Sequence, residues 1–316
     1  MISLRTTGAI WSEFLKQPSG SAPLGYDGST TFHHRRTGAS RLSTQDFIVE
    51  LFCRIDDRMA GVPKDPRAHL WPGEIVTLGV LFTLKGGSQR RFYHWLSSNH
   101  RPLFPRLPER TRLFRLLTAH QAWADRFLAE PTLINYSDSL GIELVHPRRQ
   151  GRSERQIGKK GLSNGRWIAE ATFGGRVGVK FCPLLNGRGQ IVDWDADPAN
   201  VHDGQFQRTI GDYETREHDR VACLTDKGFH RSARRGGDCT NLVICERGQR
   251  NYRMIIETVF SSWVRVLGMK KVGERLWPPV EARLAFACAA WNLVTAWATQ
   301  SQGGTWASLS TAWVPI

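Results

Sequence analysis

Two short apolar runs in the middle of the chain each end in an aspartate, and this feature constrains the fold most. The first run leads to Asp138 and the second to Asp226. Apolar runs of five or so residues bounded by turn residues predict buried strands. A helix-like stretch that begins at about Gln249 carries a third acid, Glu257. Carboxylates at two strand ends and on one helix can converge, so the pattern predicts an α/β fold with an acidic site.

Strand and helix signals alternate through residues 131–300. Strands are predicted at 133–138, 142–145, 166–172, 177–185, 190–194, 221–226 and 242–246. Two helices follow, one from about 249 and one over 280–299, each with apolar residues at helical spacing. We therefore expect an α/β domain over 131–300 and a C-terminal tail over 301–316.

The part of the chain before residue 131 has a different character. Residues 1–41 are rich in turn residues and lack periodicity, which predicts a flexible extension. Residues 42–130 form a predicted small all-α domain of four helices, the last over 109–128. A Gly-Gly-Ser turn at 86–88 separates the second and third helices, and this arrangement is compatible with a helix-turn-helix-like DNA reader.

Charge narrows the choice of partner. The net charge is +14 and the pI is near 10.0, so the partner should be a polyanion, with DNA or RNA first and an anionic membrane surface second. The positive charge gathers after the first predicted strands, at Arg148, Arg149, Arg152, Lys159 and Lys160. A lone basic run is most often a solvated loop, but beside three acids we interpret it as a phosphate-binding segment.

Cysteine usage and hydropathy indicate the compartment. The six cysteines form no C-x-x-C pair, which favours reduced, packed thiols over disulfides or a zinc site. The longest apolar run, over 284–298, is shorter than the ~20 residues that span a bilayer, so it predicts a buried helix. We expect a cytoplasmic, nucleoid-associated protein that does not enter a membrane.

Three sequence blocks surround the acids. Asp138 stands in an Asp-Ser dipeptide, Asp226 is followed by Lys-Gly-Phe, and Glu257 lies in an Arg-x-x-x-Glu-x-x-Phe-Ser block that begins at Arg253. In order, separation and flanking residues these blocks resemble the DDE transposases of bacterial insertion sequences, over about residues 45–300. A further block at 197–203 and the lysine at 180 are also similar to the family. The tyrosine and lysine of the family's longer glutamate signature are replaced here by Arg250 and Val264.

The resemblance implies a ribonuclease-H-like catalytic domain, with a mixed sheet flanked by helices, behind the helical domain. It implies that Asp138, Asp226 and Glu257 are catalytic and hold two Mg²⁺ or Mn²⁺ ions, which would serve phosphodiester cleavage. Arg253 lies one helical turn before Glu257 and would orient it or bind a DNA phosphate. In the block at 197–203, Asn200, His202 and Asp203 are interpreted as structural first and substrate-contacting second.

The implied activity is cleavage of insertion-sequence ends and joining of the freed 3′-hydroxyl to target DNA. Double-stranded DNA is the expected partner, and a homodimer the expected assembly. Two alternatives stay open: a metal-dependent nuclease of the same fold that does not transfer strands, and a transposase relic that only binds DNA. A strand-transfer assay separates the first alternative from the transposase.

Overall fold

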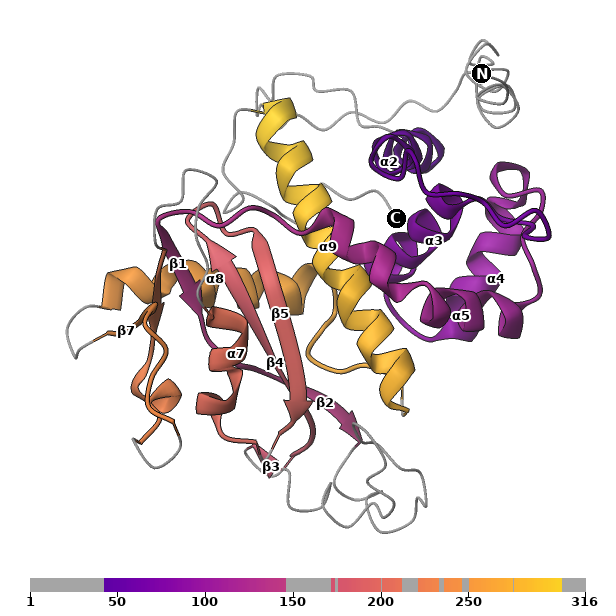
Figure 1. Cartoon of the computed structure of the whole chain (residues 1–316). Helices are drawn as coiled ribbons and strands as arrows, with labels where there is room; N and C mark the ends of the chain where they lie inside the picture. Colours follow the sequence, from indigo (N-terminus) through magenta and orange to yellow (C-terminus); the bar gives the residue numbers. More distant parts are fainter. Residues whose placement is uncertain are drawn as a thin grey trace, which may run out of the picture.

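The architecture is mixed α/β, with a mixed sheet flanked by helices (Figure 1). The computed structural model describes residues 43–145, 172–173, 176–199, 201–211, 221–232, 236–245, 250–274 and 276–302. The predicted extension over 1–41 and the tail over 303–316 lie outside the described residues. The basic run from Arg148 to Lys160 and Asn200 lie outside them as well.

Every described element before residue 131 is helical. These elements are α2 (Thr44–Arg58), α3 (Pro72–Lys85), α4 (Gln89–Asn99), η1 (Arg101–Leu103), α5 (Arg110–Ala119) and η2 (Gln121–Phe127). Ser43 caps α2 by accepting the amide of Asp46 at 3.1 Å, and Pro72 opens α3, where no amide hydrogen is needed.

The single helix predicted over 109–128 is wrong. Helix α5 ends at Ala119, and the chain tightens into the 3₁₀ helix η2. At the break His120 stacks on Trp123, with ring centroids 4.1 Å apart. At the other end the carbonyl of Phe127 accepts a hydrogen bond from Asn292, 165 residues later. Tertiary contacts therefore override a local pattern that favours one long helix.

The described strands form one sheet. They are β1 (Ile134–Ser137), β2 (Leu140–Val145), β3 (Thr172–Phe173), β4 (Arg176–Asn186), β5 (Ile191–Pro198), β6 (Ala222–Thr225) and β7 (Leu242–Ile244). β4 is antiparallel to β1, β2, β3 and β5, whereas β1, β6 and β7 run parallel. The predicted strands at 133–138, 142–145, 177–185, 190–194, 221–226 and 242–246 correspond to β1, β2, β4, β5, β6 and β7.

β1 and β2 lie along the same edge of β4 as two halves of one line. Ser137 pairs with Leu184, and Leu140 pairs with Phe181. No residue is inserted between these pairs, so Asp138 and Ser139 lie opposite Pro183 and Cys182. The sheet order is therefore β5, β4, the β1–β2 line, β6 and β7.

Helices cover both faces of this sheet, and strand alternation decides which residues meet them. On one face Phe181 stacks against Trp263 of α8 (Arg250–Val266), with ring centroids 4.7 Å apart. On the other face Cys182 and Leu184 pack in a small cluster with Phe206, which lies in the 3₁₀ helix η4 (Asp203–Phe206). The same sheet thus rests on α8 behind and on the η4 region in front (Figure 1).

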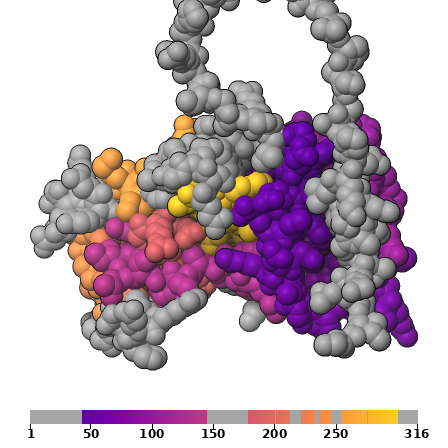
Figure 2. Space-filling view, turned by 90° about the horizontal axis from the view of Figure 1, so that it is seen from above, coloured from indigo at the N-terminus to yellow at the C-terminus, as the bar shows by residue number. Residues whose placement is uncertain are grey.

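Helix α9 (Trp277–Gln302) contacts both the helices before residue 131 and the sheet. It begins three residues before the predicted start because Pro278 and Pro279 fit the first turn of a helix. Phe47 of α2 stacks on Trp297 at 5.2 Å, and Gly79 of α3 packs against Phe286. Figure 2 shows α9 in yellow between the early helices and the later elements. One buried cluster includes residues of α2, α3, α8 and α9 as well as the sheet. Among the described residues no helix is long and apolar enough to cross a membrane.

Candidate functional site

The parallel pairing of β1 with β6 brings two of the predicted acids to one edge of the sheet. Ile134 pairs with Ala222, and Tyr136 pairs with Leu224. Carried two residues further, this register sets Asp138 beside Asp226 at the carboxyl ends of neighbouring strands. Adjacent strands are ~4.8 Å apart, so the two carboxylates emerge side by side. Both aspartates are half-buried.

Backbone amides orient both carboxylates. The amide of Ser139 donates to Asp138 Oδ1 at 2.7 Å, where β1 continues into β2. The amide of Gly228 donates to Asp226 Oδ1 at 2.8 Å, so Asp226 caps the 3₁₀ helix η5 (Lys227–Phe229). These hydrogen bonds from backbone amides fix the direction of each carboxylate. The Asp-Lys-Gly block therefore has a structural role, the capping of η5, beside the catalytic role predicted for Asp226.

A third carboxylate, Asp203, faces the same place. A Cβ on Gly228 would lie 2.9 Å from Asp226 Oδ1 and 3.2 Å from Asp203 Oδ2. Gly228 therefore lets two carboxylates approach its backbone more closely than any residue with a Cβ would allow. Lys180 of β4 donates to Asp203 Oδ1 at 2.9 Å and to the carbonyl of Val201, also at 2.9 Å. Asp138, Asp226 and Asp203 together form what we call the acidic edge of the sheet. Lys180 contacts this edge through Asp203. The sequence interpretation gave Lys180 and Asp203 only secondary roles.

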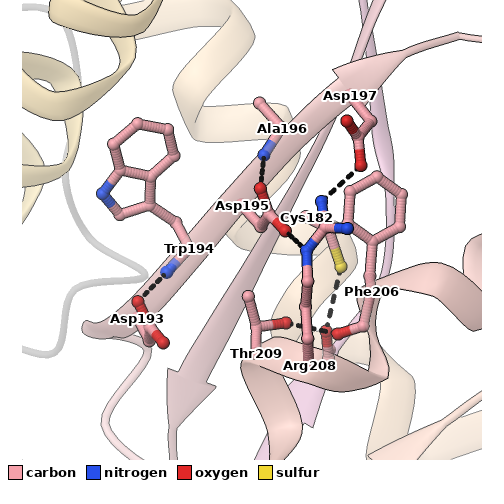
Figure 3. A network of polar contacts seen from close by, with 10 residues as sticks. Cys182, Asp193, Trp194, Asp195, Ala196, Asp197, Phe206, Arg208 and Thr209 are labelled. Carbon is pink, nitrogen blue, oxygen red and sulfur yellow. Dashed lines mark hydrogen bonds and ion pairs between the residues drawn. The ribbon is translucent and has the colours of Figure 1, made fainter. Parts of the chain in front are cut away.

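The segment that carries Asp203 is tied down on two sides. Figure 3 shows Arg208 of α7 (Gln207–Ile210) reaching Asp195 and Asp197 on β5. On the other side Gln207 donates to the carbonyl of Phe229 at 2.6 Å, directly after the Asp226 turn. These contacts hold the segment between β5 and η5, and they fix Asp203 relative to Asp226.

Cys182 lies beneath this edge. Its sulfur is 3.2 Å from Ser137 Oγ, and the side chain is fully buried. Burial raises the pKa of the Cys182 thiol well above its usual range, and the carboxylates of Asp138 and Asp203 raise it too. The thiol is therefore neutral at physiological pH and acts as packing rather than as a nucleophile or metal ligand.

Glu257 occupies a different setting. Ile256, Val259 and Trp263 form the buried stripe of α8, and Glu257 lies exposed beside that stripe. Helix α8 packs against β1 and β6, the two strands that end in the aspartates. Its convergence with Asp138 and Asp226 stays a prediction. Within the described ranges, no three His, Cys, Asp or Glu side chains are arranged to hold a metal ion.

The predicted DNA-contacting residues are largely not described. Arg148, Arg149, Arg152, Lys159 and Lys160 lie outside the described residues, and only the backbone of Arg253 is described, within α8. The sequence interpretation missed three cavity-lining arginines, Arg58, Arg126 and Arg188. Because they come from separate segments, no motif could have grouped them.

No family model, curated protein or solved structure matches this chain.

Proposed function

We propose that the chain is a metal-dependent DNA transposase that cuts DNA ends and joins a 3′-hydroxyl to a target strand. The observation that carries the proposal is the parallel register of β1 and β6, which sets Asp138 beside Asp226. Carboxylates that leave neighbouring parallel strands at one edge suit the oxygen-rich coordination that Mg²⁺ requires. Gly228 also lets Asp226 and Asp203 approach each other, because a Cβ there would lie 2.9 and 3.2 Å from their carboxylate oxygens, and so a further carboxylate lies beside Asp226.

The sheet order supports the same proposal. A central parallel pair, an antiparallel strand beside it and helices on both faces are what a ribonuclease-H-like domain requires. Tyr136 and Leu224 pack in the cluster that contains the buried stripe of α8. Strand side chains alternate, so Asp138 and Asp226, two residues further on, are expected to point to the side of α8. Glu257 of that helix is then the third acid.

Each residue has a proposed task. Asp138, Asp226 and Glu257 would hold Mg²⁺ or Mn²⁺, which when bound activates the attacking oxygen and stabilises the leaving oxygen of a phosphodiester. The amides of Ser139 and Gly228 orient the two aspartates before any ion binds. Lys180 fixes Asp203 and offsets part of the negative charge that the three aspartates bring together.

The test is a strand-transfer assay with Mg²⁺ and a duplex that ends in a 3′-hydroxyl. Asp138→Asn, Asp226→Asn and Glu257→Gln should each reduce the rate by about 1000-fold or more, since a lost ligand removes several kcal/mol of charge stabilisation. DNA binding in EDTA should survive. Asp57→Asn, at an exposed position on α2, is the matched control and should keep the wild-type rate.

The products distinguish the alternatives. Joined strands support a transposase, whereas cleaved but unjoined DNA indicates a nuclease. DNA binding without Mg²⁺-dependent products indicates a relic. A rate near wild type for any of the three acid variants would remove that residue from the site.

A further inference from the structure

A polar cavity of about 600 Å³ lies where the helical region meets the sheet. Three arginines from separate segments line it: Arg58 at the end of α2, Arg126 in η2 and Arg188 in the β4–β5 turn. Glu130 is the one carboxylate among the described lining residues. The charged side chains that line the cavity are therefore three arginines and one glutamate, and none of Asp138, Asp203 and Asp226 is among the lining residues.

The three guanidinium groups have N–H donors that are not paired with a carboxylate of the described residues. In the described part of the chain, no carboxylate forms an ion pair with Arg58, Arg126 or Arg188. Arg58 Nη1 makes one long contact of 3.4 Å with the carbonyl of Arg126, and its guanidinium lies 5.8 Å from the ring of Phe127. A guanidinium carries five donors in a planar fork that matches phosphate oxygens.

Hydrogen bonds hold the walls of the cavity in place. Asn186 Oδ1 accepts the amides of Arg188 and Gln190, each at 3.0 Å, and so fixes the turn that presents Arg188. Thr132 Oγ1 accepts the amide of Gly187 at 2.8 Å, which ties this turn to the start of β1. A wall held by hydrogen bonds is suited to bind an anion, because little of its backbone freedom is lost on binding.

We propose that this cavity binds phosphate groups of a DNA backbone. The cationic lining selects a phosphate, and the choice of DNA rests on the proposed function. The cavity lies at the start of β1, and Asp138 follows the end of that strand. Asp138 comes six positions after Thr132 in the sequence, so their Cα atoms are at most about 22 Å apart. One strand of a duplex carries a phosphate every ~3.4 Å along the axis, so a phosphate held in the cavity lies within about six nucleotides of the acidic edge.

The experiment measures affinity for a 30-base-pair duplex in EDTA at several salt concentrations. Changing all three arginines to glutamine should weaken binding roughly 100-fold at 0.1 M salt and lower the slope of log affinity against log salt by about 2.7. Changing the same residues to lysine keeps the charge and should retain most of the slope. The matched control changes three exposed arginines outside the cavity, Arg106, Arg110 and Arg115, to glutamine. Circular dichroism verifies that each variant is folded.

Binding loss specific to the cavity variant supports the proposal, whether or not Mg²⁺-dependent cleavage is ever seen. Equal losses in the cavity and control variants, or no loss, would overturn it. Inorganic pyrophosphate serves as the second probe, by calorimetry. If the wild type binds pyrophosphate through these arginines but not DNA, the site takes a small phosphate and the DNA assignment is wrong. Failure of strand transfer alone would instead count against the proposed function.

Discussion

At the scale of single residues, the site depends on a missing side chain as much as on its acids. The amide of Gly228 donates to Asp226, and the lack of a Cβ lets Asp226 and Asp203 lie close to this backbone. Gly228→Ala should move the Asp226 carboxylate, because the new Cβ would lie 2.9 Å from Oδ1. Displacing a catalytic group by about 1 Å costs on the order of 100-fold in rate. Single-turnover cleavage kinetics measure the effect.

The control for this substitution is Gly273→Ala, since a Cβ there meets nothing within 4 Å. It should keep the wild-type rate. If Gly228→Ala were as active as Gly273→Ala, the lack of a Cβ at residue 228 would not be needed for the reaction.

Sequence reasoning reached the residues whose surroundings are local. Asp138 and Asp226 were predictable because each ends an apolar run in the sequence, and the register of β1 and β6 sets both at one edge of the sheet. Lys180 and Asp203 lie 23 residues apart and meet only because β5 and η4 fold back over β4. The cavity arginines were out of reach because their grouping depends on how α2, η2 and the β4–β5 turn pack together.

At the scale of elements, α9 packs against both the helical region and the sheet. Its Asn292 is buried, accepts the amide of Ile191 at 2.8 Å, and donates to the carbonyls of Phe127 and Ile191 at 2.8 and 2.7 Å. Asn292→Ala would leave the amide of Ile191 and the carbonyl of Phe127 without this partner, whereas the carbonyl of Ile191 still accepts the amide of Ala129. Each buried group left unsatisfied costs about 1–3 kcal/mol, so we expect the free energy of unfolding to fall by about 3 kcal/mol.

Urea unfolding followed by tryptophan fluorescence checks this expectation. Asn99→Ala, at the exposed end of α4, is the control and should change the free energy of unfolding by less than about 0.5 kcal/mol. Equal stability of the two variants would mean that Asn292 does not join η2 and β5 to the helix.

The elements also show where periodicity fails as a guide. The strands and the starts of α2, α3 and α4 were predictable because their signals are local in the sequence. Helix-capping residues mark the helix starts, and short apolar runs mark the strands. The break at His120 was not, because it depends on α9 packing against η2 from more than 150 residues away. Helix α3 is buried along nearly its whole length, so of the two helices around the Gly-Gly-Ser turn only α4 offers a charged face, with Arg90, Arg91 and His94 exposed.

At the scale of the whole molecule, the charge of +14 is unevenly placed. One cavity is lined by three arginines, whereas another, of about 300 Å³, is lined by four acids, Asp125, Asp193, Asp195 and Glu281. Burial raises the pKa of Asp125, and so do the nearby charges of Asp193 and Glu281. A polyanion would avoid this acidic side, so DNA is expected to approach from elsewhere on the surface.

The last prediction concerns how separate basic regions contribute to one binding event. Replacing Arg148, Arg149 and Arg152 by alanine should weaken binding to all DNA sequences alike and lower the salt slope by about 2.7, since each phosphate contact contributes about 0.9. Combined with the glutamine changes at the three cavity arginines, the losses in slope should add, because each phosphate contact releases its own counterions. Anisotropy titrations of the two triple variants and the combined variant test this. If the combined slope equals that of either triple variant, the two regions contact the same phosphates. If the first triple variant keeps the wild-type slope, the run is a solvated loop, and the exposed face of α4 becomes the next region to test.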